Sequence, residues 1–179
     1  LYENGWGVTQ DYAEAMRWYL KAAGQDNSDA QSQVGYLYQN GYGVEQDYTR
    51  AAEWYRKGAE AGSAIAQYNL AALYEDGQGV EQNYAKAMRW YRASAEQGDS
   101  DAENQVGWFY RNGYGVRQDY GKAFEWYLRS AQQDNPTGQY NLAALYQDGL
   151  GVEQDYVKAL EWFMKAAGQG DTDALNQVG

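Results

Sequence analysis

The sequence predicts an all-helical fold, an α-solenoid of stacked antiparallel helical hairpins that forms a single domain over residues 1–179. Three observations predict it. The tetrapeptide Gly-x-Gly-Val occurs five times in steps of 36 residues, beginning at residues 5, 41, 77, 113 and 149. Each copy lies between two helical patterns of apolar residues. A single hairpin of this size cannot bury its apolar face, so about five successive hairpins must stack.

The helix that follows each Gly-x-Gly-Val is termed the B helix. In the second repeat Asp47 is a candidate N-cap, and the helix ends near Gly62. A Trp lies beside the apolar face in every copy, next to small residues, which favours packing against a neighbouring repeat over a ligand platform. These residues are Trp18, Trp54, Trp90, Trp126 and Trp162. The expected B helices span about 11–23, 47–61, 83–97, 119–133 and 155–168.

The helix that precedes each Gly-x-Gly-Val is termed the A helix, and the first Gly of the tetrapeptide ends it. We expect A helices at about 29–40, 64–76, 100–112 and 136–148, with a partial one at the C-terminal end and no strand. Gly35 and Gly107 should mark close helix contacts, as should Ala71 and Ala143. The residues expected to be largely buried are Tyr48, Ala51, Tyr55, Leu70, Tyr74, Tyr84, Val106 and Leu142.

One complete repeat carries a specific resemblance. The run Asn69-Leu70-Ala71-Ala72-Leu73-Tyr74, followed by Gly77-Gln78-Gly79-Val80 and then by Lys86-Ala87 and Trp90-Tyr91, resembles the Sel1-like repeat family, which is related to the tetratricopeptide repeat. The resemblance extends over essentially the whole chain. It implies a right-handed superhelix with the A helices on the concave side. It also implies an adaptor that assembles protein complexes, in bacteria often in the envelope or in host interaction.

The composition excludes several classes of function. The chain has no Cys and no His, which rules out disulfides, thiol nucleophiles, Cys/His zinc sites and His-based triads. With 14 Lys and Arg scattered among 25 Asp and Glu, the net charge of −11 argues against nucleic acid and anionic membranes. No apolar run is long enough to span a bilayer. We therefore expect no enzyme activity, no cofactor, no nucleic acid and no membrane insertion.

Three motifs have a chemical interpretation that the sequence does not favour. Gly-x-Gly-Val resembles part of a phosphate-binding loop, but it follows a helix rather than a strand. Asp99-Ser100-Asp101 and Asp171-Thr172-Asp173 resemble the start of a calcium loop, whose later ligands are missing, so an N-cap is expected. The carboxylate pairs Glu45/Asp47 and Glu153/Asp155 lie in polar loops before B helices, where an N-cap role is expected.

The side of the A helix opposite its core is the candidate binding surface. One large aromatic residue occurs there in each repeat, alternating between two neighbouring positions: Tyr36, Tyr68, Trp108 and Tyr140. Polar residues lie beside them: Ser32, Gln39, Glu75, Asn104, Arg111 and Gln147, and an amide column of Gln33, Asn69, Gln105, Asn141 and Gln177. Exposed rings and amides are typical of a recognition groove. The same rings could instead pack against the next A helix and extend the core.

The predicted function is that of a scaffold or adaptor that binds a protein or an extended peptide on the concave A-helix surface. The partner-binding residues are Tyr36, Gln39, Tyr68, Asn69, Asn104, Trp108, Arg111, Tyr140 and Asn141. The alternative is a glycan- or cell-wall-binding module, because Tyr and Trp with Asn and Gln also suit sugars. An inert spacer is the remaining hypothesis.

The two ends of the sequence fall in the phase of an A helix, so we expect a fragment of a longer array. Leu1 and Tyr2 at one end, and Leu175 and Val178 at the other, would leave apolar faces uncovered. Two chains placed head to tail could cover them, which predicts weak, open-ended self-association.

Overall fold

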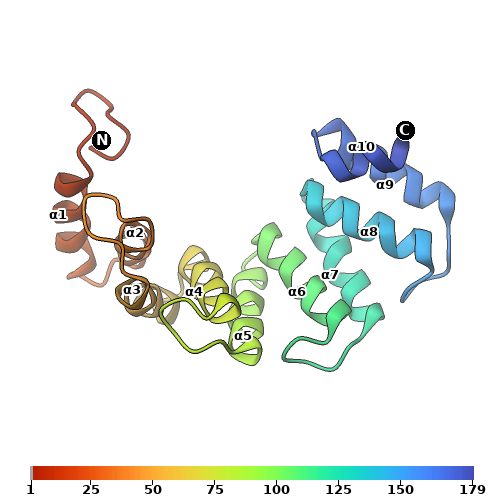
Figure 1. The fold of residues 1–179 in the computed structure, drawn as a ribbon, viewed down its shortest axis with the longest axis horizontal. Helices are drawn as coiled ribbons and strands as arrows, with labels where there is room; N and C mark the ends of the chain where they lie inside the picture. Colours follow the sequence, from red (N-terminus) through yellow and green to blue (C-terminus); the bar gives the residue numbers. More distant parts are fainter. Residues whose placement is uncertain (1) are drawn as a thin grey trace. The chain divides into compact units, whose positions relative to one another are not determined.

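The computed structural model describes residues 2–179, and within them the chain forms ten helices and no strand (Figure 1). The B helices are α1 (Tyr12–Ala23), α3 (Tyr48–Glu60), α5 (Tyr84–Ala95), α7 (Tyr120–Gln132) and α9 (Tyr156–Gly168). The A helices are α2 (Ser28–Asn40), α4 (Ala64–Asp76), α6 (Ser100–Asn112), α8 (Pro136–Asp148) and the short α10 (Thr172–Val178). The fold class expected from the sequence is confirmed, and the helix bounds agree to within two residues.

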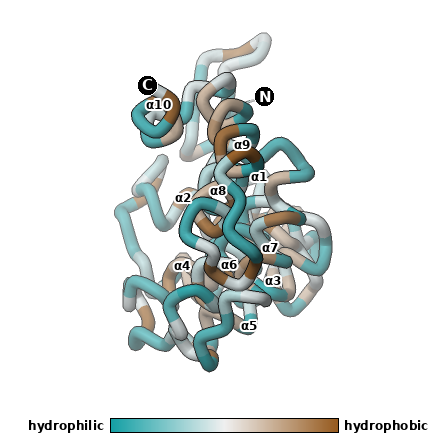
Figure 2. The backbone as a smooth tube through the Cα atoms, turned by 90° about the vertical axis from the view of Figure 1, so that its right-hand side faces the viewer, coloured by the Kyte–Doolittle hydropathy of each residue, from teal (hydrophilic) through white to brown (hydrophobic). Residues whose placement is uncertain are grey.

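The chain divides into two compact units, Leu1–Trp90 and Tyr91–Gly179, with the boundary inside α5. In the first unit α2 contacts α1, α3 and α4, so that each helix packs on its neighbours in the chain and one A helix contacts the next. In the second unit α6, α7, α8, α9 and α10 repeat this arrangement. Most of the connecting loops are hydrophilic (Figure 2), as solvated loops are expected to be.

Both kinds of helix begin and end with local signals present in the sequence. The Asp47 side chain accepts a hydrogen bond from the backbone N–H of Arg50 at 2.9 Å, and Asp99 accepts from Asp101 and Ala102 at 3.0 Å. These are N-caps, as expected for the acidic motifs. Gly41 ends α2 in the left-handed conformation, with φ of 70°, and its N–H donates to the carbonyl of Leu37. The Gly-x-Gly-Val loop is therefore a helix C-cap.

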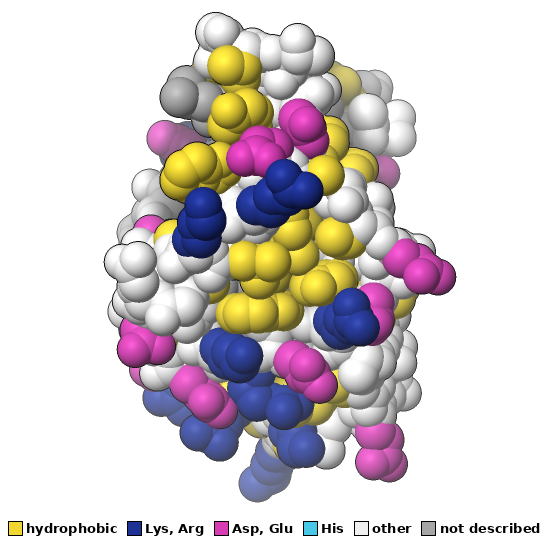
Figure 3. Space-filling model, turned by 90° about the vertical axis from the view of Figure 1, so that its left-hand side faces the viewer, with side chains coloured by type: hydrophobic (Ala, Val, Ile, Leu, Met, Phe, Trp, Pro, Cys, Tyr) yellow, Lys and Arg dark blue, Asp and Glu magenta, His cyan; other side chains and the backbone are white. Residues whose placement is uncertain are grey.

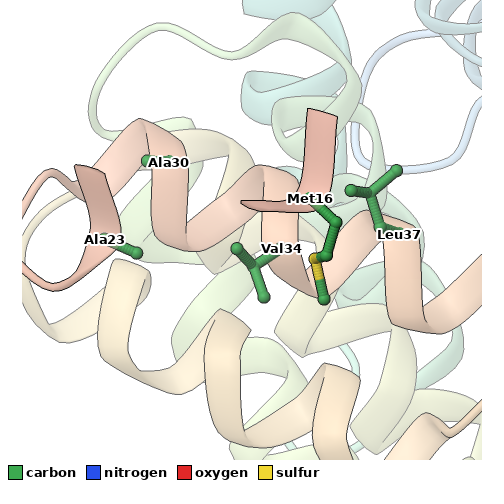
Figure 4. Packing of buried hydrophobic residues seen from close by; sticks show 5 residues of the cluster. All are labelled: Met16, Ala23, Ala30, Val34 and Leu37. Carbon is green, nitrogen blue, oxygen red and sulfur yellow. The ribbon is translucent and has the colours of Figure 1, made fainter. Parts of the chain in front are cut away.

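A buried apolar cluster joins the first repeat to the second. Met16 and Ala23 of α1 lie against Ala30, Val34 and Leu37 of α2 (Figure 4). The partly buried Trp54 of α3 packs against the same cluster, so it contacts the preceding helix pair, as predicted for the Trp of the B helix. In the second unit Trp162 packs in the same way against the cluster that contains Ala123, Tyr127 and Leu142.

The two glycines expected at close helix contacts are confirmed in that role. A Cβ atom at Gly35 would lie 2.7 Å from the Tyr55 ring, and one at Gly107 would lie 2.7 Å from the Tyr127 ring. Both tyrosines are fully buried. Close approach of an A helix to the following B helix therefore depends on the absence of a side chain at these positions.

The second glycine of each loop has a different role, which joins successive repeats. A Cβ atom at Gly43 would lie 2.5 Å from the backbone at Tyr12, the first residue of the preceding B helix. A Cβ atom at Gly79 would meet the carbonyl group of Tyr48 in the same way. Each of these loops therefore packs directly on the N-terminus of the B helix one repeat earlier.

Most of the expected core residues are buried, and Tyr48 and Tyr84 are of intermediate exposure. Each is the first residue of its B helix, where its ring reaches the surface. The Gln46 side-chain amide donates to the Tyr48 hydroxyl at 3.2 Å and to the carbonyl of Gln39 at 2.8 Å. The hydroxyl groups of these tyrosines thus contribute hydrogen bonds to the loop that precedes each helix.

Candidate functional site

The four predicted aromatic residues of the A helices all reach the surface, and none of them is fully buried. Tyr36 is 40% exposed, whereas Tyr68, Trp108 and Tyr140 are partly buried. Trp108 and Tyr140 also pack against the core clusters of the second unit. These rings therefore combine the two roles that the sequence left open, since each contributes to packing and keeps some surface in contact with solvent.

Two further aromatic residues belong to this surface and were missed at the level of sequence. They occupy the variable position of Gly-x-Gly-Val: Tyr42 pairs with Tyr36 at 5.8 Å between ring centroids, and Tyr114 pairs with Trp108 at 4.9 Å. Tyr42 also stacks on Tyr12 at 4.9 Å. The signal was present, because Tyr42 and Tyr114 follow the same 72-residue alternation as Tyr36 and Trp108. We call Tyr36–Tyr42 and Trp108–Tyr114 the aromatic pairs.

A shallow cavity of about 250 Å³ brings several predicted residues together in the first unit. It lies between α2 and α4 and is lined by Ser32, Gln33, Tyr36, Ile65, Asn69 and, from the N-terminal segment, Glu3. Ile65 is exposed, and Glu3 accepts a hydrogen bond from the Tyr19 hydroxyl at 2.6 Å. The cavity thus presents an aromatic ring, an aliphatic side chain and several hydrogen-bonding groups side by side.

Several polar residues of the A helices are less exposed to solvent than the sequence predicted. Ser32 and Asn104 are buried, so the expectation of an outward orientation is wrong for both. The reason is contact between neighbouring helices: the Asn141 amide donates to the Asn104 side-chain oxygen at 2.8 Å, and the Ser32 and Ser63 hydroxyls lie 2.9 Å apart. Asn69 and Asn141 themselves are partly buried.

Gln39 and Arg111 occupy equivalent positions and both lie near a buried tyrosine hydroxyl. Tyr55 donates to the Gln39 side-chain oxygen at 2.7 Å. In the second unit burial raises the pKa of Tyr127 to about 12, although the positive charge of Arg111 acts in the opposite direction. Both residues are partly exposed and border the aromatic pairs in sequence. They therefore contribute to the fold as well as to the surface.

Glu103 is a buried carboxylate at a position that is glutamine in three other repeats: Gln31, Gln67 and Gln139. The Gln67 and Gln139 amides donate to the carbonyls of Ala59 and Ala131. Glu103 cannot donate in this way when ionised, and it accepts from the Gln133 amide at 2.6 Å. Burial raises its pKa, and Asp99 adds to the rise, while the Gln133 hydrogen bond and Arg129 oppose it.

Replacing Glu103 by Gln should stabilise the fold by about 1 kcal/mol at neutral pH. The raised pKa means that stability is greatest below the unfolded pKa of the carboxyl group and falls as pH rises through the folded pKa. The variant should lose this dependence and gain a donor for a helix carbonyl. Urea unfolding at acidic and neutral pH measures the effect, with the exposed Glu125→Gln as control. An unchanged pH profile in Glu103→Gln would contradict the prediction.

Residues 2–179 contain no group of three or more Asp or Glu side chains placed to hold a metal ion. Glu45 and Asp47 line an open hollow together with Tyr38 and Arg50, and Arg50 pairs with Asp47 at 3.4 Å. Within the same residues no helix has the length and apolar character needed to cross a bilayer.

The charged residues are strongly segregated, so the expectation that Lys and Arg are scattered is wrong. Within residues 2–179, the B helices carry 12 of the 14 basic residues and only 5 of the 25 acidic ones. The basic residues there are Arg17, Lys21, Arg50, Arg56, Lys57, Lys86, Arg89, Arg92, Lys122, Arg129, Lys158 and Lys165, all of them exposed. Figure 3 shows Lys and Arg side chains gathered beside apolar ones on one face. Helical periodicity thus places the cations of one B helix on the same side of that helix.

The last B helix exposes apolar side chains that earlier repeats cover. Leu160 of α9 is 47% exposed, whereas Met16, at the equivalent position of α1, is buried beneath α2 and α3. Leu175 and Val178 of α10 are also exposed, as expected for this end. Tyr2 is partly buried at the other end, and Leu1 lies outside the described residues.

A model of one protein family matches the repeats of this chain one after another. The Sel1 repeat model matches residues 1–27, 28–63, 64–99, 100–135 and 136–171. The structure of a protective antigen of uropathogenic Escherichia coli, which has an SLR fold, is 38% identical with a TM-score of 0.94; the match covers 99% of this chain and 38% of that one. A Sel1 repeat protein from Oxalobacter formigenes is 36% identical with a TM-score of 0.93, and the match covers 99% of this chain and 71% of that one.

More distant structures share the fold alone. An immunity protein from Pseudomonas aeruginosa is 21% identical with a TM-score of 0.60, and the match covers 93% of this chain and 62% of that one. No curated protein matched the chain. The chain spans 38% of the length of the Escherichia coli antigen and thus corresponds to only part of it.

Proposed function

Because the chain belongs to the Sel1 repeat family, we propose that it binds a protein or an extended peptide on the surface formed by its A helices. Sel1 repeat proteins commonly act as scaffolds for protein–protein interaction and are typically not catalytic. The observation that carries the proposal is the cavity between α2 and α4, where Tyr36 and Asn69 lie together.

The chemistry of this cavity suits a peptide. The Tyr36–Tyr42 pair offers rigid aromatic surface that loses little conformational entropy on binding. The exposed Ile65 offers an aliphatic contact, and the Asn69 amide can donate to and accept from a peptide backbone. In the second unit the Trp108–Tyr114 pair provides the aromatic rings, and Arg111 provides a positive charge. This combination favours a peptide with an acidic residue next to Arg111.

Selection from a displayed peptide library tests this proposal. Peptides that bind the chain should lose at least about tenfold in affinity when Tyr36 and Asn69 are both replaced by Ala, since central aromatic anchors contribute about 2 kcal/mol or more. The quadruple variant with Ala at Tyr36, Tyr68, Trp108 and Tyr140 should bind no peptide. Circular dichroism must first show that the helices persist, because Trp108 and Tyr140 also pack against the core.

The matched control replaces two exposed side chains elsewhere. Tyr156 and Val157, at the start of the B helix α9, are both highly exposed and lie outside the A helices. The Tyr156→Ala/Val157→Ala variant should therefore bind as the wild type does. Equal losses in the two double variants would refute the A-helix surface as the binding site. A glycan array run with the same proteins addresses the alternative, and Tyr36-dependent binding to sugars alone would assign the surface to carbohydrate.

We also propose weak head-to-tail self-association through the exposed end faces. Leu160 of α9 and Leu175 of α10 lie on a face that a further helix pair would cover. Such a contact joins two different surfaces and so propagates as an open chain. Sedimentation across a wide concentration range should show a rising weight-average mass that Leu160→Glu abolishes. A monomer at all concentrations would contradict the proposal.

A further inference from the structure

We propose that the exposed faces of the B helices form a second binding surface in each unit, and that its partner is an acidic segment of another polypeptide. The B helices together carry a net charge of +7, from 12 basic and 5 acidic residues, whereas the rest of the chain carries −18. A protein that is acidic as a whole thus carries an excess of basic residues on the B helices of each unit. Electrostatic complementarity at short range selects an acidic partner for it.

The basic surface is built from a unit that recurs in three helices. Each unit has a cation, a Trp four residues later and a second cation three residues after the Trp: Arg50–Trp54–Lys57, Lys122–Trp126–Arg129 and Lys158–Trp162–Lys165. Residues at this spacing lie on one face of a helix. We call this unit the cation–Trp–cation row; α3 of the first unit and α7 and α9 of the second each contain one.

The two cations of a row differ in the group that they contact. The first is paired with the N-cap aspartate, as for Arg50 and Asp47 at 3.4 Å and for Lys158 and Asp155 at 3.2 Å. The second cation lies over the Trp ring, at 4.0 Å for Lys57 and 3.8 Å for Lys165, measured from Nζ to the ring centroid. Neither of these lysines forms an ion pair with any residue between 2 and 179.

The Trp ring therefore holds a cation without cancelling its charge. A free surface lysine loses side-chain entropy when it pairs with a carboxylate, and that loss offsets much of the gain. Over a ring the ammonium group is already positioned, so less entropy is lost when an incoming carboxylate binds. Lys21 over Trp18 at 4.2 Å and Arg129 over Trp126 at 4.5 Å extend the same arrangement to α1 and α7.

The surface suits an acidic polypeptide better than a phosphate polymer or an anionic bilayer. An exposed glutamate precedes the Trp in every row: Glu53, Glu125 and Glu161. These carboxylates repel a dense array of phosphates, as do the acidic residues on the rest of the chain. A polypeptide has fewer charges per unit length, its apolar side chains can pack beside the half-buried Trp54 and Trp162, and its backbone N–H groups can donate to the glutamates.

The experiment measures binding of a fluorescein-labelled synthetic peptide of Glu-Glu-Phe repeats to the intact chain by anisotropy. The Lys57→Gln/Lys165→Gln variant keeps a polar side chain only one atom shorter than lysine and both Trp rings, but lowers the net charge by two. We expect its affinity for the peptide to fall about five- to tenfold, and binding by the wild type to weaken as salt is added. Circular dichroism confirms that both proteins are folded.

The matched control is Arg117→Glu, which also lowers the net charge by two but lies in the exposed loop before α7. It should bind the peptide within about twofold of the wild type. No binding by the wild type, or an equal loss in both variants, would overturn the proposal. Tighter binding to phosphatidylserine vesicles or to an oligonucleotide than to the peptide would also overturn it, because the partner would then be of another class.

Discussion

Gly107→Leu should destabilise the second unit by at least about 3 kcal/mol, because the contact between α6 and α7 has no room for a side chain. A Cβ atom alone would lie 2.7 Å from the Tyr127 ring, which is fully buried. A leucine adds three more carbon atoms at the same place, so the ring or the helix must move. Urea unfolding followed by circular dichroism measures the loss.

Two further variants separate overpacking from a general effect of replacing glycine. Gly107→Ala should destabilise less than Gly107→Leu but still measurably, because its Cβ atom alone would lie 2.7 Å from the Tyr127 ring. At Gly168, the last residue of α9, an added Cβ atom would have no neighbour within 4 Å. Gly168→Leu should therefore stabilise the fold slightly, by less than about 1 kcal/mol, because leucine favours the helix more than glycine does. If Gly107→Leu were as stable as the wild type, the close contact between α6 and α7 at this position would be refuted.

Gly79→Ala should weaken the junction between successive repeats by about 2–4 kcal/mol. Its φ of 67° lies in the left-handed region, where alanine is strained by about 1–2 kcal/mol. In addition, the new Cβ atom would meet the backbone carbonyl group of Tyr48, which belongs to a helix and cannot rotate away as a side chain would. Thermal unfolding of the variant measures the combined effect.

Gly7→Ala provides the matched control, because it has the same kind of backbone without the contact. Its φ is 75°, and a Cβ atom there would meet nothing within 4 Å. We expect a loss of no more than about 1–2 kcal/mol from backbone strain alone. The difference between the two variants measures the inter-repeat contact, and equal losses would show that the loop does not pack on the preceding helix.

The sequence alone determined the repeat, the helices and their ends, since these depend on residues close together in the chain. A 36-residue period, an aspartate before each complete B helix except at Asn83, and a glycine after each complete A helix are local signals that tertiary contacts do not override. The packing role of Gly35 and Gly107 also followed from sequence, because a small residue beside an apolar face permits close approach.

Only the tertiary structure decided which side chains of a predicted surface reach the solvent. Asn104 and Tyr68 share one position in the repeat, yet Asn104 is buried against Asn141 while Tyr68 stays partly exposed, because burial depends on the neighbouring helix and not on the helix itself. The pairing of Tyr36 with Tyr42 required the loop to turn back over its own helix. The excess of cations on the B helices, by contrast, follows from the sequence and the helix bounds, although a net charge of −11 conceals it.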